Sequence, residues 1–453
     1  MVMVADVLPG LKRCLRSLGL NEAARMMVAR MIAGFLGHTG RMSGLQAAGS
    51  IRTQTRHRAQ VGRFLGRKRW RGEPPNARLR EQVLAMFPSR GLYVFVVDAT
   101  LCSQQGKKTE NTFSTGNRQR RPKKGRRYGK KKHASKSVHS FTMGLLITPT
   151  GMRIPFQRAY KTEAYCKVKG LTHRTSAESA ADMIRGLPVA DGTRVIVLGD
   201  TAYDAAVVRE ACAERGFTWI VPCNPERVLS GLKPRPKVRS LIKDLSSVSL
   251  TKIRFAPGQG PYAVYRRLSA HRIGPKAKPR TYHVHQERRE VHSLGAVRLV
   301  FSTTKLTLKN ATPDDVKILL TNDETLSLKE IIELYSLRWQ VELFFKELKS
   351  TLGFHQYRFQ HFECVEAWVE MALTTFLYLE WHRAGQLTRR GLSEKEKAWW
   401  RSQRTYGLCQ AVRQASQQAE LKYLADRLET PGGLQKLKRL IFTSFPSEYR
   451  AAL

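Results

Sequence analysis

The stretch GLYVFVVDAT, residues 91–100, is a run of apolar, Val-rich sequence that reaches an aspartate, Asp98. Such a run predicts a strand that is buried on both faces, as in the centre of an α/β sheet. A second run of this kind, TRVIVLGD at 193–200, ends at Asp200. The sequence therefore predicts two buried central strands, each delivering a carboxylate at or near its end.

Further strands and helices are predicted around these two runs. Strand-like segments lie at 138–149, 153–160, 217–223 and 316–322. Helical segments lie at 175–187, 203–216, 326–352 and 354–383. Strands that alternate with helices after an initial meander indicate an α/β protein with a mixed sheet flanked by helices. Residues 225–310 instead have alternating, basic, β-leaning sequence, which predicts an inserted β-strand subdomain.

The charge of the chain is far from balanced. Its 453 residues include 79 Lys and Arg against 36 Asp and Glu, a formal net charge of +43. A field of that sign attracts polyanions, of which nucleic acid is the commonest. Binding to an anionic membrane is the competing interpretation, but neither a basic amphipathic anchor nor a spanning segment is evident. Seven scattered cysteines without CxxC spacing favour reduced thiols over a zinc or disulfide framework.

The stretch YSLRWQVELFFKELKS, residues 335–350, predicts a helix with an unusual polar edge. At ~100° per residue, Arg338, Glu342 and Lys349 point to about −60°, −20° and −40° relative to Tyr335. These four side chains therefore share one sector, next to a broad apolar stripe that would dock the helix on a core. They are expected at the edge of the buried face, where a cleft could open. Lys346 and Glu347 of the same helix are expected to face solvent or, loosely, DNA.

Asp98, Asp200 and Glu342 together suggest a metal site. A single aspartate at a strand end is more often a cap or turn residue, and that interpretation stays open for each of the two. Asp204, four residues after Asp200, is expected to cap the following helix rather than to be a fourth ligand. Three convergent carboxylates, however, are what a pair of Mg²⁺ ions needs, namely hard oxygen ligands with positions left for substrate phosphate. Arg338 and Lys349 would then lie beside the metals as phosphate contacts.

The spacing Tyr335-x2-Arg338-x3-Glu342-x6-Lys349 resembles the Y-R-E-K signature of DDE transposases of the insertion-sequence-four group of bacterial mobile elements. The order of strand-borne aspartates, β insertion and helix-borne glutamate is also that of this group, and GDTAYDAA around Asp200 looks like its second-aspartate region. The resemblance covers roughly residues 90–380. It implies a ribonuclease-H-like catalytic domain interrupted by a β insertion.

The resemblance also implies roles for individual residues. Asp98, Asp200 and Glu342 would be the catalytic carboxylates that bind two Mg²⁺ ions, with Mn²⁺ able to substitute, while Tyr335, Arg338 and Lys349 would hold DNA phosphates with help from Lys346. Members of the group free the element through a DNA hairpin, aided by a tryptophan of the β insertion. This chain has no tryptophan between Trp219 and Trp339, so its sequence does not decide between a hairpin and a non-hairpin route. Candidate stacking substitutes are Phe255, Tyr262, Tyr265 and Tyr282.

The segment NRQRRPKKGRRYGKKK, residues 117–132, has ten basic residues and no acid. It joins the first predicted strand to the second, so it is expected to emerge near Asp98 and to follow the phosphates of bound DNA. Simple solubilisation is the alternative. The expected DNA contacts in this loop are Arg118, Arg120, Arg121, Lys123, Lys124, Arg126, Arg127, Tyr128, Lys130, Lys131 and Lys132.

The chain divides into five predicted parts. These are a helical DNA-binding domain (1–88), the catalytic domain in two parts (89–224 and 311–385), the β insertion subdomain (225–310) and a C-terminal helical region for DNA binding or dimerisation (386–453). The expected function is a DNA transposase of the bacterial cytoplasm and nucleoid. It would bind terminal inverted repeats of double-stranded DNA as a homodimer in the synaptic complex and perform two-metal cleavage and strand transfer. A transposase-derived DNA-binding protein without catalysis and a basic RNA-binding protein are the alternatives.

Overall fold

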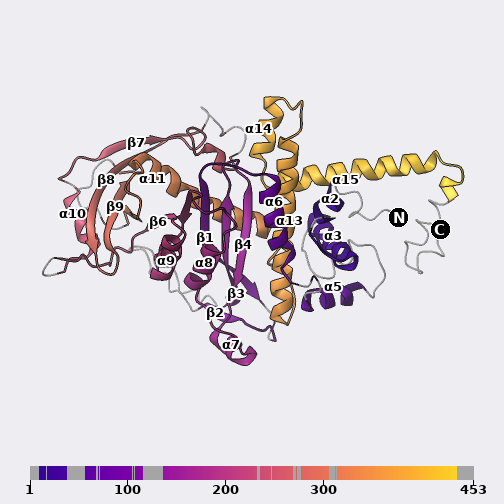
Figure 1. The fold of residues 1–453 in the computed structure, drawn as a ribbon, viewed down its shortest axis with the longest axis horizontal. Coiled ribbons are helices and arrows are strands. Elements are labelled where there is room, and N and C mark those ends of the chain that lie inside the picture. The colour runs from indigo at the N-terminus through magenta and orange to yellow at the C-terminus, as the bar shows by residue number, and fades with distance from the viewer. Residues whose placement is uncertain are drawn as a thin grey trace, which may run out of the picture.

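A computed structural model describes residues 10–37, 57–115, 136–305 and 312–435, except for 17, 68, 69, 71, 105, 107, 232–234, 246, 269–271, 273–276 and 313. Within these residues the protein is a mixed α/β structure with one ten-stranded sheet and 13 α-helices (Figure 1). None of the described helices is long and apolar enough to cross a membrane.

The sheet contains every strand of the described structure. Along its main path the order is β2-β3-β1-β5-β6-β10-β9-β8-β7, and β4 pairs with β3. The strands are β1 (Tyr93–Gln104), β2 (Phe113–Thr115), β3 (Lys136–Ile147), β4 (Arg153–Ala159), β5 (Val195–Leu198), β6 (Thr218–Pro222), β7 (Thr251–Phe255), β8 (Arg280–Val291), β9 (Gly295–Thr303) and β10 (Lys317–Thr321).

The centre of the sheet has the arrangement expected of a ribonuclease-H-like transposase fold. β1 pairs antiparallel with β3 and parallel with β5, and β5 pairs parallel with β6. The residues of β5 and the first five of β1 are all buried. A strand covered on both faces needs a continuous apolar run, which explains why these two segments could be recognised in the sequence.

The strands from residues 225–310 extend this same sheet. β7 pairs with β8, β8 with β9, and β9 continues the sheet by pairing with β10. The expectation of β-strand structure throughout residues 225–310 is wrong in part, because Ala263–Tyr265 forms a 3-10 helix. A short helix, α10 (Leu241–Asp244), also interrupts the expected all-strand segment. A separate insertion subdomain therefore stays a prediction.

Most predicted helices are present, although the one predicted over 354–383 begins only at Phe362. Those of the first half are α2 (Leu11–Arg16), α3 (Glu22–Gly37), α5 (His57–Gly66), α6 (Pro75–Met86), α7 (Glu163–Lys169), α8 (Ser176–Arg185) and α9 (Ala206–Glu214). Those of the second half are α11 (Leu328–Tyr335), α12 (Trp339–Ser350), α13 (Phe362–Leu387), α14 (Glu394–Ser402) and α15 (Thr405–Leu428). The single helix predicted over 326–352 is divided, because a 3-10 turn at Ser336–Arg338 separates α11 from α12.

Helix α13 is the central support of the molecule. It is buried along most of its length, since it packs against β4 on one side and against α3, α5 and α6 on another (Figure 1). A helix surrounded in this way must be apolar on nearly all faces, as this one is. The N-terminal helices thus dock on the α/β part through α13, and all seven cysteines are buried and free.

Candidate active site

Asp98 and Asp200 lie side by side at one edge of the central sheet. Val96 of β1 pairs with Leu198, the last residue of β5, in parallel register, and each aspartate lies two residues further along the chain. Neighbouring strands are about 4.8 Å apart, so parallel register brings the two carboxylates together. Gly199 assists this arrangement, because a Cβ at its position would lie 2.9 Å from the Cβ of Tyr203.

Each aspartate already uses one oxygen in a local hydrogen bond. Asp98 Oδ1 accepts a 2.7 Å bond from the backbone N–H of Ala99. Asp200 Oδ1 accepts from the N–H of Ala202 at 2.9 Å and so caps the short 3-10 helix Thr201–Tyr203. The capping interpretation of Asp200 is therefore confirmed, and the cap leaves the second carboxylate oxygen unused.

Glu342 reaches this edge from α12 through Arg338. The Arg338 guanidinium contacts Asp98 Oδ2 through Nη1 at 3.3 Å and Glu342 Oε1 through Nη2. The side chains of Asp98 and Arg338 are 18% and 19% exposed, and that of Glu342 is 32% exposed. The third acid is thus brought to the first by a shared, half-buried cation.

The electrostatics of Asp98 reveal how closely the acids interact. The pKa of Asp98 is raised to about 6, mainly by burial; the charges of Asp200 and Glu342 contribute to the rise, while the Ala99 hydrogen bond and Arg338 oppose it. Burial alone can raise the pKa of a carboxyl group, but the contributions of Asp200 and Glu342 indicate that their charges lie near Asp98. The three acids predicted from the sequence therefore form one electrostatic group.

Tyr335 is buried beside this group rather than open to solvent. Burial raises the pKa of its phenol to about 12, and the charges of Asp200 and Asp98 add to the shift. The Lys317 ammonium lies 4.8 Å from the centre of the Tyr335 ring, a favourable cation–π distance. Tyr335 is consequently a neutral hydrogen-bond donor at the edge of the carboxylates.

The two lysines of the helix differ in their surroundings. Lys349 Nζ donates to the carbonyl of Leu101 at 3.1 Å, which ties the end of α12 to β1. Lys346 is exposed. Glu347, expected to face solvent or DNA, is instead buried at 6% exposure, because its carboxylate pairs with Arg153.

Asp204, four residues after Asp200, has a different role. It was expected to cap the following helix, but the N-cap residue of α9 is Ala205. The Asp204 carboxylate is 2% exposed and pairs with Arg209 at 2.7 Å and Arg227 at 2.6 Å. It is therefore a structural ion-pair acceptor beneath the site.

The aromatic residues proposed as stacking substitutes are mostly core residues. Phe255 and Tyr265 are 4% and 5% exposed, and the Tyr265 hydroxyl donates to the Leu92 carbonyl. Tyr262 is also buried and donates to Glu330; Tyr282 is partly exposed. An aromatic ring does stand open next to Arg338, namely Trp339, which is 55% exposed.

Sequence reasoning missed three residues around the acids. Tyr203 is 2% exposed, and besides burial, the charges of Asp98 and Asp200 raise the pKa of its phenol. Lys317 approaches Tyr335 from β10. For Trp339 the signal was present, because a tryptophan on the polar edge of an amphipathic helix is unusual; Tyr203 and Lys317 belong to segments that look like ordinary strand and turn.

The three carboxylates fit a divalent metal by chemistry but not in their present arrangement. They offer hard oxygen ligands, and the mutual repulsion felt by Asp98 is what a cation would relieve. Within the described residues, however, no three His, Cys, Asp or Glu side chains lie in a group that could hold a metal ion. The Arg338 guanidinium contacts Asp98 and Glu342 instead, and supplies part of the neutralising charge.

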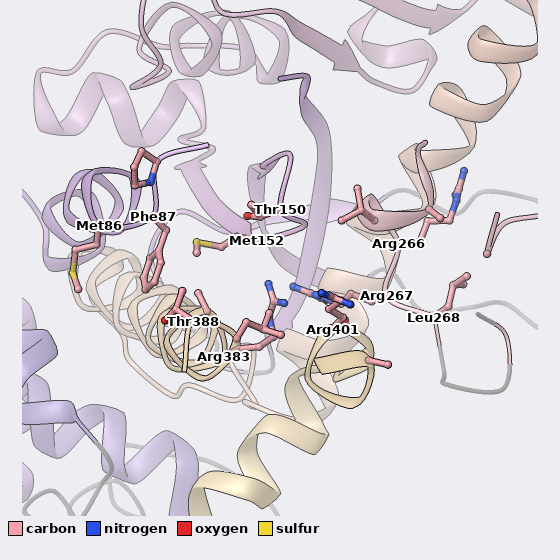
Figure 2. Close-up of a pocket in the computed structure, with 17 residues that line it drawn as sticks. Met86, Phe87, Thr150, Met152, Arg266, Arg267, Leu268, Arg383, Thr388 and Arg401 are labelled. Carbon is pink, nitrogen blue, oxygen red and sulfur yellow. Dashed lines mark hydrogen bonds between the residues drawn. The ribbon is translucent and has the colours of Figure 1, made fainter. Parts of the chain in front are cut away.

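The eleven predicted DNA contacts of the loop 117–132 lie outside the described residues. A cavity of about 820 Å³ is found elsewhere, where α6, α13 and α14 meet the segment around Arg267 (Figure 2). Its lining is largely apolar and includes none of the proposed site residues. It is therefore no part of the carboxylate site.

Comparison with known proteins agrees with this arrangement. A family model described as Transposase DDE domain matches residues 89–377, which is more than half of the chain. The chain belongs to this family of transposases. A search of curated proteins found no match. The matched range includes all three carboxylates, so the family assignment and the site fall on the same part of the molecule.

Proposed function

We propose that this protein is a cut-and-paste transposase in which Asp98, Asp200 and Glu342 are the catalytic carboxylates. The observation that carries the proposal is that the three acids lie together at one edge of the sheet: Asp98 and Asp200 each lie two residues beyond a paired position of β1 and β5, and Arg338 contacts both Asp98 and Glu342. Burial is the main cause of the raised pKa of Asp98, and the charges of Asp200 and Glu342 contribute to it. Structural ion pairs normally lower the pKa of a carboxyl group. Acids that instead repel one another at a sheet edge are typical of a site built for a cation.

The proposed cofactor is Mg²⁺, with Mn²⁺ able to replace it. Bound by Asp98, Asp200 and Glu342, a pair of such ions would activate water or a 3′-hydroxyl and stabilise the leaving oxygen of the cleaved phosphodiester. The protein's own contribution is to hold the carboxylates on two rigid strands and one helix.

Arg338 has two roles in this proposal. Without DNA its guanidinium neutralises Asp98 and Glu342, which it contacts directly. When a DNA phosphate arrives, the guanidinium turns to it, because a planar donor pair matches phosphate as well as carboxylate. The carboxylates are thereby freed for metal only when substrate is present.

The same helix supports assignment to the insertion-sequence-four group. Tyr335, Arg338, Glu342 and Lys349 have the spacing of its signature, and each lies at or next to the carboxylate edge. In this proposal Tyr335 and Lys349 hold phosphates near the cut end, and exposed Lys346 assists them. The exposed ring of Trp339 is available to stack on a base beside the cut.

The net charge of +43 supports DNA as the substrate. Residues 1–88, the loop 117–132 and the C-terminal region are proposed to bind the terminal inverted repeats and target DNA, with two copies of the chain holding two ends. Such an enzyme would act on bacterial DNA in the cytoplasm.

Incubation with candidate end DNA tests the proposal. Short inverted repeats that flank the reading frame identify the substrate, and cleavage is followed with Mg²⁺, Mn²⁺ or chelator. We expect metal-dependent cuts at the repeat ends, followed by strand transfer. Tight end binding without cleavage in either metal would favour a transposase-derived DNA-binding protein, and preference for RNA would favour the RNA-binding alternative.

A further inference from the structure

The helix that carries Glu342 is anchored by two buried polar residues, Gln340 and Glu347. They are 3% and 6% exposed. Because they are seven residues apart, they point within about 20° of each other, whereas Glu342 points about 200° from Gln340. The two anchors therefore bracket Glu342 along α12 and hold the helix from its other side.

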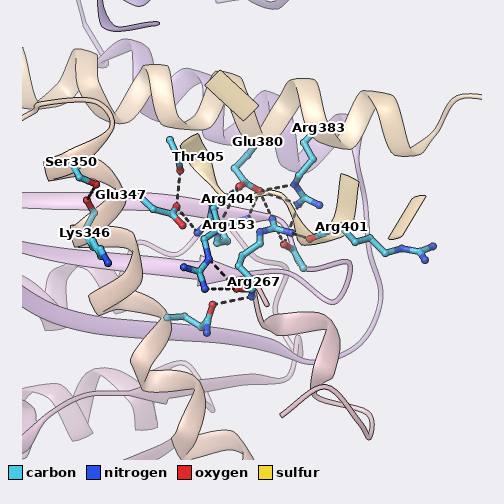
Figure 3. Close-up of polar contacts among 12 residues, drawn as sticks. Arg153, Arg267, Lys346, Glu347, Ser350, Glu380, Arg383, Arg401, Arg404 and Thr405 are labelled. Carbon is cyan, nitrogen blue, oxygen red and sulfur yellow. Dashed lines mark hydrogen bonds and ion pairs between the residues drawn. The ribbon is translucent and has the colours of Figure 1, made fainter. Parts of the chain in front are cut away.

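The first anchor is Glu347, whose contacts both fall on one oxygen. Its Oε2 accepts from Arg153 Nη1 at 2.9 Å and from the hydroxyl of Thr405 at 2.6 Å (Figure 3). Its buried Oε1 has no hydrogen-bond partner among the described residues. Arg153 is in turn fixed by Glu380 of α13, at 3.0 Å and 3.1 Å. The position of Glu347 thus depends on just two donors.

The second anchor, Gln340, is connected through Arg267 to the same segment of the chain as Glu347, near Thr405. Its Oε1 accepts from the backbone N–H of Arg267 at 3.3 Å. The Arg267 guanidinium donates to the carbonyl of Arg401 at 2.8 Å, and Arg404 donates back to the carbonyl of Arg267. Both anchors of α12 therefore end at residues 401–405, where α14 passes into α15.

We infer that Gln340 and Glu347 are positioning residues. Through them, the packing of the α14–α15 junction fixes the orientation of α12 about its axis, and so the position of Glu342. A helix held at two points on one face cannot turn about its axis, and a misplacement of about 1 Å at a reacting centre can cost about 100-fold in rate. Helix α15 also contacts α3 of the N-terminal region. The geometry of Glu342 is thus tied to the helices expected to bind DNA. The inference rests on the proposed function for its catalytic consequence only.

Thr405→Val is the most direct test, because it removes the donor hydroxyl while keeping the side-chain shape of a buried residue. Hydrogen–deuterium exchange of α12 is measured on the full chain without DNA. We expect exchange of α12 amides to become about three- to tenfold faster, the effect of one lost buried hydrogen bond. Thr405→Ser, which keeps the hydroxyl, should restore slow exchange.

Thr175→Val is the matched control. Thr175 caps α8 through its hydroxyl in a capping box with Glu178, so the loss in stability is similar in kind but has no connection to α12. Faster α12 exchange in Thr405→Val alone supports the inference. Equal α12 exchange in the two valine variants would overturn it, whatever the DNA assays give.

The cleavage assay then gives the functional consequence. Thr405→Val is expected to cut about tenfold more slowly at saturating end DNA and to need more Mg²⁺, with end binding unchanged, because Glu342 is less well placed as a ligand. A Thr405→Val variant with faster α12 exchange but a normal rate and Mg²⁺ requirement would contradict positioning of Glu342. Failure of the wild-type chain to cut DNA would reject the proposed function while leaving the exchange result intact.

Discussion

Two groups of arginines and carboxylates adjoin α12, and they differ in what their charges do. At the sheet edge, Arg338 contacts Asp98 and Glu342, and the pKa of Asp98 is raised to about 6. On the buried side, Glu380 pairs with Arg153, Arg267 and Arg383, and the pKa of Glu380 is lowered well below its usual range, because these three cations outweigh its burial.

The different charge balance of the two groups distinguishes the proposed functional site from the structural ion-pair network. The buried group has three cations around one acid, Glu380, and is closed to solvent, as is typical of a structural network. In the edge group one arginine contacts two acids, Asp98 and Glu342, Asp200 lies near Asp98, and the group is partly open. Similar residue types thus hold the fold on one side of the helix, and on the other side they form the site proposed to bind a cation.

Asp200→Asn and Asp204→Asn should give the largest effects, and they compare a proposed site residue with a structural residue within one short segment. Asp200→Asn removes a proposed metal ligand, which is worth several kcal/mol of transition-state stabilisation, or roughly a thousandfold in cleavage rate. Asp204→Asn breaks a buried ion pair with Arg209 and Arg227, so it should lower the melting temperature. Single-turnover cleavage measures the rate of each variant, and thermal unfolding measures its stability. A loss of cleavage rate in Asp204→Asn but not in Asp200→Asn would contradict the roles given to the two aspartates.

Glu380→Gln tests the structural side of the comparison. The change leaves Arg153, Arg267 and Arg383 with too little negative charge, and we expect a loss of about 3–5 kcal/mol in the free energy of unfolding. Glu226→Gln is the control, since Glu226 also pairs with two cations but is 48% exposed, and such pairs contribute only about 0–1 kcal/mol. Equal losses in urea unfolding would contradict the role given to the buried group.

The pH dependence of stability should differ between the two sides in sign. The pKa of Asp98 rises from 3.8 to about 6 on folding, so ionised Asp98 destabilises the protein above pH 6 and its protonation relieves this as pH falls towards 4. Asp98→Asn should therefore be more stable than wild type at pH 8, by at most about 3 kcal/mol. This advantage should vanish near pH 4; an advantage that grew on acidification would show that Asp98 is held as a paired anion.

Arg338→Gln should give the smallest effect. Without the guanidinium, Asp98 and Glu342 lose their neutralising cation, so Mn²⁺ should bind about tenfold more tightly in the absence of DNA. Cleavage should nevertheless fall, because the phosphate contact is lost. Unchanged Mn²⁺ affinity by calorimetry would show that Arg338 does not compete with metal.

The sequence predicted which residues come together at the candidate site better than it predicted the distant residues that pack around them. Continuous apolar runs marked β1 and β5, and parallel register then necessarily joins Asp98 to Asp200. Helical spacing placed Glu342 beside Arg338. These features depend on local periodicity, which a sequence records directly.

Long-range contacts were beyond such reasoning. Glu347 looked like a solvent-facing residue, because nothing near it indicates the buried Arg153 of β4 or Thr405 of α15. Asp204 looked like a helix cap because its partner Arg227 lies beyond β6. A buried polar residue can be recognised only when its distant partner is known.

Binding of Mn²⁺ to the complex with end DNA tests the central claim most directly. Electron paramagnetic resonance titration compares wild type with Asp98→Asn, using Asp204→Asn as the control for a folded but weakened protein. The account predicts that wild type and Asp204→Asn bind Mn²⁺ and that Asp98→Asn loses this binding. Equal Mn²⁺ binding by wild type and Asp98→Asn would contradict a metal site formed by Asp98, Asp200 and Glu342.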